Sequence, residues 1–411
     1  MYFDGSGVPV VLLKNSQAAS EARGRISELL LRGANGNAAR VAQVAGQMAS
    51  LRVEHARFDF RELYDWYKDM VMPAAFAVSG VVMTDIDERR NRIVVGVRDG
   101  ASLGRARASM AALGLPRDAY DVAEYDVAGL EMPASTQNVE DCDPMTAIIE
   151  CPEPPSGASG DTTSLRATRR PIIGGLQIQY SEGFSAFNCS LGYNIVHHDA
   201  VGTLSANRYF VTNSHCGAIG QMTGMSMGQS TAFENVSNEL ADPPFFSAGT
   251  DAMCPPGRLC RYSDASLFQY YSPTLGALGR VAFPNLGQLN VGLQREVVAG
   301  GDPVVGMVVH RIGRTTGRSV GTVDQTCANF VVYDEGFDTG RMFLCQSRAT
   351  YASASGDSGG PVVEVLSDGT LVARGIHWRG NGGFSPMNAV LAELRAVTGG
   401  GLGPTIHDAT P

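Results

Sequence analysis

Charged residues are scarce in this sequence, and basic ones are fewer than acidic ones. Only 18% of the 411 residues are charged, and 32 Lys and Arg against 41 Asp and Glu give a formal net charge of -9. Nucleic-acid binding needs a basic face that neutralises phosphates, so no nucleic-acid partner is expected. Few charges combined with 49 glycines favour a β-rich extracellular protein with many turns.

Cysteine is missing before Cys142, and long apolar runs are missing throughout. Eight cysteines confined to one part of the chain predict disulfides formed in an oxidising compartment, and eight reduced core thiols are the alternative. No Cys-x-x-Cys pair predicts a zinc site, and we expect neither metal nor cofactor. No run reaches the roughly 18 apolar residues of a membrane-spanning helix, so we expect no membrane partner.

The amino terminus lacks the basic leader of a secretory signal. Met1 to Asp4 contains no basic residue, and Val8 to Leu13 is a short apolar run that favours a strand. The cysteines nevertheless favour a secreted protein over a cytoplasmic one. The true start is therefore expected upstream, or the leader has been removed.

Residues 1–130 are predicted to form a small α+β unit without cysteine. Apolar residues recur at helical spacing from Glu21 to Met72, and Pro73 is expected to end that stretch. The later part is predicted to form a hairpin, a helix and a strand, at Ala75 to Thr84, Arg92 to Val97, Ser102 to Leu113 and Tyr120 to Tyr125.

Residues 131–171 have the composition of a linker. They are rich in Pro, Gly, Ser and Thr, and Cys142 and Cys151 are predicted to close a small loop there. The segment ends in Arg169 and Arg170, an exposed basic pair that suits proteolytic processing. A solvated charge pair in a loop is the alternative.

Residues 172–411 alternate short strands with glycine-rich turns. A helical pattern appears only from Asn388 to Val397. Many short strands predict a sandwich or barrel, and about 240 residues are enough for two barrels of about six strands each. The chain is therefore expected to be mainly β, with the α+β unit in front and a short helix near the end.

Ser358 has the surroundings of a catalytic nucleophile. It lies in the run Gly-Asp-Ser-Gly-Gly-Pro that starts at Gly356. Flanking glycines permit a tight turn and let a substrate carbonyl reach the N–H groups of Gly356 and Ser358, which would form an oxyanion hole. The run also fits the elbow of α/β-hydrolases, which need an acid and then a histidine after the serine. Only 53 residues follow Ser358, too few for that fold.

Two upstream motifs supply the base and the acid that a serine nucleophile needs. His215 follows the apolar run from Tyr209 to Val211, and Asp264 comes just before another apolar strand. Either residue alone would be interpreted as structural. In the order His, Asp, Ser, with spacings of 49 and 94 residues, the three predict a catalytic triad of His215, Asp264 and Ser358.

The region from Ile172 to about Arg395 resembles the chymotrypsin superfamily, and within it the bacterial streptogrisin and α-lytic protease branch. The resemblance rests on the triad motifs and on Ile-Gly-Gly at 173–175, Cys-Ser-Leu-Gly-Tyr at 189–193 and Gly-Arg-Thr-Thr-Gly at 313–317. It covers a little over half of the chain. It implies two perpendicular six-stranded β-barrels, with a serine endopeptidase site for protein or peptide substrates in the cleft between them.

The resemblance also implies how the cysteines pair. The expected disulfides are Cys189–Cys216, Cys254–Cys260 and Cys327–Cys345. Another crosslink of this branch often flanks the Gly-Arg-Thr-Thr-Gly turn, but His310 and Val320 stand at those two positions. That crosslink is therefore missing here.

Asp357 needs a cationic partner, because an isolated buried carboxylate is costly. In the bacterial branch this partner is an internal arginine, at the position that Arg311 occupies here. The competing interpretation is a freed amine at Ile172 or Ile173, as in animal trypsin-like enzymes. Pro171 disfavours it, because these enzymes cleave poorly before proline.

The resemblance places a specificity pocket between the segments 351–355 and 375–380. Ala352 stands where trypsin-like enzymes have an aspartate, so Lys or Arg specificity is not expected. Gly-Ile-His-Trp resembles the pocket wall of glutamyl endopeptidases, in which His377 and Ser353 would bind a substrate carboxylate. A packed His377 facing an apolar pocket is the alternative, so both Glu and a medium apolar residue remain open. The expected pocket residues are Ala352, Ser353, His377, Trp378 and Arg379.

The amino-terminal unit resembles the pro-regions of these proteases by position and size. As a pro-region it would assist folding of the barrels and block the cleft until removed, whereas the alternative is a retained binding module. The expected protein is thus a monomeric, secreted serine endopeptidase made as a precursor. A catalytically inactive relative used as a binding module is the alternative, and the triad order disfavours an esterase.

Overall fold

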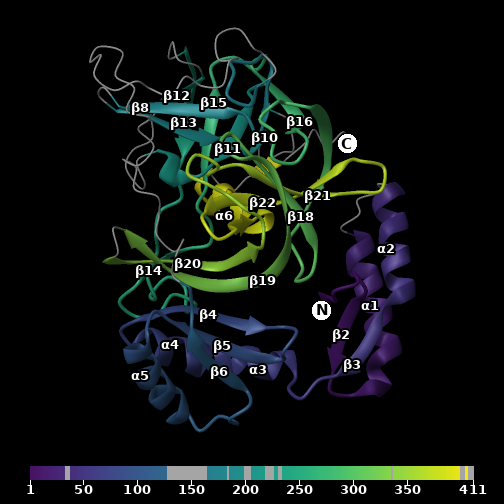
Figure 1. Ribbon diagram of the computed structural model, residues 1–411, viewed down its shortest axis with the longest axis vertical. Helices are drawn as coiled ribbons and strands as arrows, with labels where there is room; N and C mark the ends of the chain where they lie inside the picture. Colours follow the sequence, from purple (N-terminus) through teal and green to yellow (C-terminus); the bar gives the residue numbers. More distant parts are fainter. Residues whose placement is uncertain are drawn as a thin grey trace.

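The computed structural model describes most of the chain, and its architecture is mainly β (Figure 1). The described residues are 1–32, 38–126, 164–182, 185–198, 205–217, 226–229, 234–334, 337–398 and 403–405. The predicted Cys142–Cys151 loop and the predicted boundary between residues 130 and 131 lie outside them. No helix among these residues is long and apolar enough to cross a membrane.

One barrel-like sheet holds the first half of the carboxy-terminal region, drawn in teal in Figure 1. Its strands follow the order β24-β10-β11-β15-β13-β12-β8-β9. Their bounds are β8 (Gln177–Glu182), β9 (Ser185–Ser190), β10 (Tyr193–His198), β11 (Tyr209–Thr212), β12 (Ser226–Gln229), β13 (Glu234–Ala241), β15 (Ser266–Tyr270) and β24 (Gly403–Thr405). The short helix η3 (Ser214–Cys216) follows β11.

A second sheet, green to yellow in Figure 1, curves around the rest of this region. Its strands are β14 (Leu259–Arg261), β18 (Val308–Gly313), β19 (Gly317–Asp334), β20 (Phe337–Ala349), β21 (Pro361–Val365), β22 (Leu371–Arg379) and β23 (Gly383–Pro386). Three further strands join its edge, namely β7 (Ile172–Gly174), β16 (Gly276–Phe283) and β17 (Leu293–Gly300). The helix α6 (Met387–Val397) agrees closely with the predicted terminal helix.

The two barrels share one core. Phe210 and Leu267 of the first barrel and Ile312 and Ile376 of the second belong to the same buried cluster, and Leu394 of α6 joins them. Burying such side chains supplies most of the driving force for folding. The chain thus has a chymotrypsin-like β-barrel fold, as the sequence predicts.

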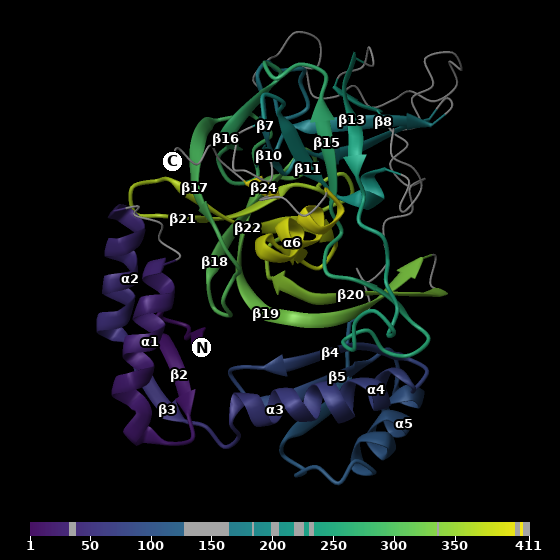
Figure 2. The same cartoon turned by 180° about the vertical axis from the view of Figure 1, so that it is seen from behind.

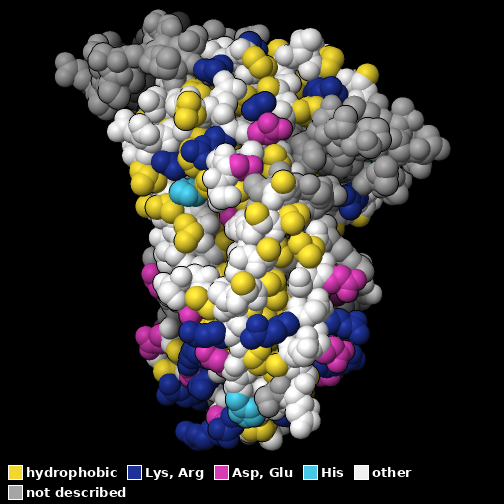
Figure 3. Space-filling view, turned by 90° about the vertical axis from the view of Figure 1, so that its right-hand side faces the viewer, with side chains coloured by type: hydrophobic (Ala, Val, Ile, Leu, Met, Phe, Trp, Pro, Cys, Tyr) yellow, Lys and Arg dark blue, Asp and Glu magenta, His cyan; other side chains and the backbone are white. Residues whose placement is uncertain are grey.

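The amino-terminal residues form two separate layers. The first is a three-stranded sheet of β1 (Tyr2–Phe3), β2 (Pro9–Leu13) and β3 (Arg52–His55), with η1 (Ser16–Ala18), α1 (Ala19–Arg32) and α2 (Ala38–Ser50). The second contains β4 (Val81–Asp87), β5 (Arg92–Val97) and β6 (Tyr120–Glu124), with α3 (Phe60–Trp66), η2 (Tyr67–Val71), α4 (Met72–Phe76) and α5 (Gly100–Ala111). Figure 3 shows basic and acidic side chains interspersed on the lower part of the face that carries α1 and α2.

The prediction of continuous helix from Glu21 to Met72 is wrong in its middle. The strand β3 interrupts it, because Arg52 to His55 pair in parallel with β2, and this tertiary pairing overrides the local helical spacing. Pro73 does not end the helix but lies in the first turn of α4, where its missing N–H costs nothing. The predicted strand from Ala75 therefore starts only at Val81.

The second amino-terminal layer continues the sheet of the second barrel. Strand β4 pairs with β19 in antiparallel register, with Asn329 opposite Thr84 and Phe330 opposite Met83. Both views of the ribbon show β4, β5 and β6 extending the curved sheet below β19 (Figures 1 and 2). One buried cluster joins the two sides, and it includes Phe330 of the barrel and Val82 of the layer. The amino-terminal region is therefore built into the barrel's own sheet.

Candidate active site

The first barrel brings His215 and Asp264 together. Strands β11 and β15 are antiparallel neighbours, with Thr212 opposite Ser266, so the residues just beyond their paired ends meet. The Nδ1 atom of His215 forms a short hydrogen bond with Oδ2 of Asp264. The backbone N–H of His215 also donates to Oδ1 of Asp264, at 3.2 Å. This pairing fixes the imidazole so that Nε2 is the free nitrogen.

Asp264 is fully buried and held as a charged group. Burial alone would raise its pKa, but the attraction of His215, with hydrogen bonds from His215 and Ser214 and the charge of Arg261, holds that pKa below its ordinary value. The hydroxyl of Ser214 donates to Oδ1 at 2.8 Å, and the backbone N–H of Asp264 donates to the hydroxyl of Ser385 at 3.0 Å. The carboxylate can therefore stabilise an imidazolium on His215.

Arg261 is a supporting residue that the sequence interpretation missed. Its guanidinium is fully buried and donates to the hydroxyl of Ser214 at 3.0 Å, to Asp242 at 2.9 Å and to the carbonyl of Ala265 at 3.0 Å. It thereby orients the serine that contacts Asp264. Its position three residues before Asp264 was the only available signal.

Backbone contacts hold the loop that carries Ser358 beside the His215–Asp264 pair. Its carbonyl accepts the N–H of Ser190 at 2.8 Å, and the Sγ atom of Cys216 lies 3.8 Å from the same oxygen. The next residue, Gly359, has a φ of +84°. A Cβ there would lie 2.1 Å from the Thr212 hydroxyl, so only glycine fits.

The two N–H groups predicted to form an oxyanion hole are unused. None of the hydrogen bonds within the described part of the chain employs the N–H of Gly356 or Ser358. Gly356 has a φ of +90°, and its carbonyl accepts the hydroxyl of Ser190 at 2.9 Å. A turn fixed in this way leaves two donors for a carbonyl oxygen that becomes negative during acyl transfer.

The structure shows no hydrogen bond between Ser358 and His215. Among the described residues Nε2 of His215 is buried and has no hydrogen-bond partner. Catalytic hydrogen bonds are often long in uncomplexed enzymes and tighten when substrate binds. The unpaired Nε2 is thus the atom to which a proton would move.

Asp357 is fully buried and meets Arg311. The Nη1 atom of Arg311 lies 3.0 Å from Oδ1 of Asp357. The same carboxylate accepts N–H groups of Thr315 at 2.9 Å, Thr316 at 3.1 Å and Ala354 at 2.9 Å. The N–H of Ile172, by contrast, donates to the carbonyl of Leu275 within the sheet. An internal arginine therefore neutralises Asp357 in this uncleaved chain.

The wall of the predicted substrate pocket is strand β22, which is bonded directly to the serine loop. The N–H of Gly359 donates to the carbonyl of His377 at 2.8 Å, and the N–H of His377 donates to Gly360 at 3.0 Å. On the opposite segment, the carbonyl of Ala352 accepts a bond from Arg311, and the hydroxyl oxygen of Ser353 is buried without a partner among the described residues.

His377 is buried in a cationic environment. Its Nδ1 atom lies 3.2 Å from the hydroxyl of Tyr351. Burial, followed by the charges of Arg311, His215 and Arg379, holds the pKa of His377 well below its ordinary value, although a hydrogen bond to Gly383 acts in the opposite sense. The imidazole is therefore neutral at pH 7 and supplies no positive charge to a pocket.

The other two predicted pocket residues lie at the end of β22. Trp378 packs edge-on against Phe343 of β20, with ring centroids 4.8 Å apart. The guanidinium of Arg379 stacks 3.9 Å from the ring centroid of Phe330. The structure thus places Trp378 in an aromatic cluster and leaves His377 and Arg379 as the polar side chains of the wall.

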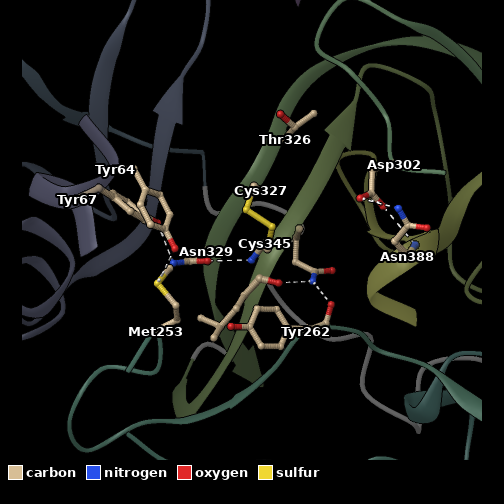
Figure 4. Close-up of a disulfide and its surroundings, with 12 residues drawn as sticks. Tyr64, Tyr67, Met253, Tyr262, Asp302, Thr326, Cys327, Asn329, Cys345 and Asn388 are labelled. Atoms are coloured by element: carbon tan, nitrogen blue, oxygen red, sulfur yellow. Dashed lines mark hydrogen bonds between the residues drawn. A yellow bond between two sulfur atoms is a disulfide. The ribbon is translucent and has the colours of Figure 1, made fainter. Parts of the chain in front are cut away.

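Three disulfides lie within the described part of the barrels. Cys189 is bonded to Cys216 next to His215, Cys254 to Cys260, and Cys327 to Cys345 across β19 and β20. These are the pairs that the resemblance implies. Figure 4 shows the Cys327–Cys345 bridge beside Asn329, whose amide nitrogen donates to the hydroxyl of Tyr67 at 2.7 Å. Disulfides of this kind are compatible with an extracellular protein.

Comparison with known proteins gives likeness in structure only. No family model matches the sequence, and no curated protein matches it. A glutamic acid-specific serine protease described as using a histidine triad in substrate binding is 24% identical, with a TM-score of 0.37 over 54% of this chain and 96% of that one. Protease A of Thermobifida fusca is 23% identical, with a TM-score of 0.36 over 54% and 94%. A Nocardiopsis protease is 22% identical, with a TM-score of 0.36 over 54% and 95%.

At these identities and scores the likeness concerns the fold alone. Within that fold, this chain's own residues provide a histidine–aspartate pair, a serine in a glycine-flanked loop and two unused N–H donors beside the serine.

Proposed function

We propose that this chain is the precursor of a secreted serine endopeptidase. The observation that carries the proposal is the buried His215–Asp264 pair beside a serine loop whose Gly356 and Ser358 N–H groups have no acceptor within the described residues. In this proposal His215 removes the proton of the Ser358 hydroxyl, which attacks the peptide carbonyl and forms an acyl-enzyme. His215 then protonates the leaving amine and later activates water for deacylation.

The roles of the other residues follow from this assignment. Asp264 stabilises the imidazolium of His215, and the N–H groups of Gly356 and Ser358 stabilise the oxyanion. Arg311 and Asp357 hold the loop that presents these donors. No part of this scheme requires a metal or cofactor.

We propose that the amino-terminal region is an intramolecular chaperone and inhibitor of the barrels. The support is the continuous β4–β19 sheet and the buried cluster that joins its two sides. Removing the region would expose Phe330 and the apolar face of β19. The β19–β20 hairpin therefore folds more favourably while the amino-terminal region covers it. Processing near Arg169 and Arg170 would separate the two parts, and both arginines bond to Gln229 in the uncleaved chain.

Two substrate preferences are compatible with the wall of the predicted pocket. His377 and Ser353 suit a Glu side chain on the acyl side of the cleaved bond, and the similar glutamic acid-specific protease is said to use histidines in substrate binding. The neutral, buried state of His377 equally suits a medium apolar residue. Secretion and action as a monomer complete the proposal.

The test is the intact mass of the full chain after treatment with a fluorophosphonate. We expect one adduct on the wild-type chain once it is cleaved near Arg169 and Arg170, and none on Ser358→Ala treated in the same way. The matched control is Ser355→Ala, which removes an exposed hydroxyl from the same loop and should retain the adduct. The unlabelled mass also shows whether the chain has been processed near residue 171.

Either of two negative results is informative. A processed chain without an adduct would contradict the proposed enzyme and favour an inactive binding module. An unprocessed chain that gains an adduct only after limited proteolysis would support the inhibitory role of the amino-terminal region.

A further inference from the structure

Arg379 is a buried cation that has no acidic partner among the described residues. The residue is 2% exposed, and within the described residues no carboxylate pairs with its Nε, Nη1 or Nη2 atoms. A guanidinium carries five N–H donors and no acceptor. Burial, partly offset by attraction to Tyr125, lowers the pKa of Arg379 to about 10, so it stays charged at neutral pH.

Other arginines that are equally buried have acidic partners. Arg311 pairs with Asp357, Arg261 with Asp242 and Arg374 with Glu364. Removing a partner from such a pair leaves an uncompensated buried charge, which is strongly unfavourable. Arg379 is in that unfavourable state in the uncomplexed protein, so an anion from outside the chain would relieve it.

Two aromatic rings and Gly383 fix the position of the Arg379 guanidinium. Its central carbon lies over two aromatic rings, 3.9 Å from the centroid of Phe330 and 5.0 Å from that of Trp378. Its stem crosses Gly383 so closely that a Cβ there would lie 2.3 Å from Nε of Arg379. Glycine at position 383 is therefore required for this placement.

The strongest attraction on the charge of Arg379 comes from Tyr125, which is a phenol and not a carboxylate. The hydroxyl of Tyr125, at the end of the amino-terminal region, donates to Gln325 at 3.0 Å and accepts from Arg348 at 2.9 Å. Arg348 itself is paired with Asp324. The phenol thus belongs to a network that is already neutral, and its contact with Arg379 brings no carboxylate to the guanidinium.

A second unsatisfied polar group lies on the opposite wall of the predicted pocket. The hydroxyl oxygen of Ser353 is buried and has no partner among the described residues. His377 is neutral, and its Nδ1 atom already faces the hydroxyl of Tyr351. The charge that a substrate carboxylate needs must therefore come from Arg379 and not from the imidazole.

We infer that Arg379 is the residue that selects an acidic side chain on the acyl side of the cleaved bond, with Ser353 as a further donor. This inference rests on the proposed peptidase and decides between its two substrate preferences in favour of Glu or Asp. A guanidinium binds a carboxylate through two parallel N–H···O bonds, which the corresponding amide of Gln cannot match. The contact adds charge-assisted hydrogen bonds in a site where the cation has lost its water.

The experiment uses the full chain after limited proteolysis near Arg169 and Arg170, which relieves the proposed inhibition. It compares kcat/KM on two peptide coumarins that differ only in Glu or Gln before the coumarin. A charge-assisted hydrogen bond contributes about 1.5–3 kcal/mol, so we expect a Glu preference of roughly 10- to 100-fold. Arg379→Gln should bring the ratio near one, mainly by raising KM for the Glu peptide. Arg348→Gln, which removes a neighbouring guanidinium already paired with Asp324, is the matched control and should keep the ratio.

An unchanged ratio in Arg379→Gln, or no Glu preference in the wild type, would overturn the inference. If Arg379→Gln does not fold, the same ratio is measured for Arg379→Lys, which keeps the positive charge but cannot form two parallel hydrogen bonds to a carboxylate. A several-fold drop then supports the inference, and an unchanged ratio contradicts it.

Failure of the proposed function would look different, because no peptide would be hydrolysed at all. In that case calorimetric binding of acetyl-Ala-Ala-Pro-Glu-amide and its Gln counterpart to the chain cleaved near Arg169 and Arg170 decides the inference. Tighter binding of the Glu peptide that is lost in Arg379→Gln supports it. Equal binding, or binding of neither peptide, contradicts it.

Discussion

Replacing Asp85 by asparagine should change how the stability of this protein responds to pH. Asp85 of β4 is 3% exposed where the amino-terminal layer meets β19. Its Oδ2 accepts the amide of Gln325 at 3.3 Å, and its Oδ1 has no hydrogen-bond partner among the described residues. Burial, then the charges of Glu88 and Asp87, raise the pKa of Asp85 well above its ordinary value.

The sign of the effect follows from where the proton is held. The unfolded chain releases the Asp85 proton above about pH 4, whereas the folded chain keeps it until the raised pKa is reached. The stability that comes from the neutral carboxyl is complete below about pH 4 and is lost as the pH rises through the folded pKa. Each pH unit in that window lowers the free energy of unfolding by about 1.4 kcal/mol for this one proton.

Asparagine keeps the shape and the contact with Gln325 but cannot ionise. Asp85→Asn should therefore be more stable than the wild type at pH 7, and its advantage should shrink as the pH falls to 5. The measurement is the urea midpoint of the full chain at half-unit steps from pH 5 to 8. Asp99→Asn is the matched control. Bonds from Ser102 hold the pKa of Asp99 at about 2, so it is ionised in the folded chain throughout this range.

The outcome that refutes this reasoning is a pair of parallel curves. If the wild type and Asp85→Asn lose stability equally between pH 5 and 8, the carboxyl of Asp85 is ionised in the folded chain. Burial between β4 and β19 would then not keep the Asp85 carboxyl protonated.

Three further predictions test the support of the site. Arg311→Met should destabilise the chain by about 3–5 kcal/mol in urea unfolding, because it leaves Asp357 buried and unpaired, and a smaller loss than in Arg311→Lys would contradict this. Ser214→Ala removes a bond of about 1.5–3 kcal/mol to the Asp264 carboxylate, so fluorophosphonate labelling should slow at least tenfold, and an unchanged rate would refute that role. Gly359→Ala should abolish labelling, because its Cβ meets Thr212 and Ser190, whereas Gly369→Ala, which has a similar φ without such overlap, should label normally.

Short-range patterns in the sequence determined the fold class and the residues of the predicted triad. Alternating short strands and turns predicted barrels, because period-two patterns report burial on one face of a sheet. The glycines around Ser358 reported a strained turn, since their φ values of +90° and +84° at Gly356 and Gly359 admit little else. The same local reasoning failed at β3, where pairing with a distant strand decided the structure.

Only the tertiary structure decided which polar groups meet and which remain unpaired. Arg261 donates to Ser214, which lies 47 residues earlier in the chain. Thr84 lies opposite Asn329 in the neighbouring strands β4 and β19, which come from opposite parts of the sequence. No periodic pattern or motif in the sequence predicts either contact. The unpaired state of Arg379 is likewise a property of everything around it, because an arginine in a sequence does not reveal whether a carboxylate will lie beside it. The sequence thus predicts which residues can carry the chemistry. Which charged groups find a partner depends on the packing of segments that are far apart in the sequence.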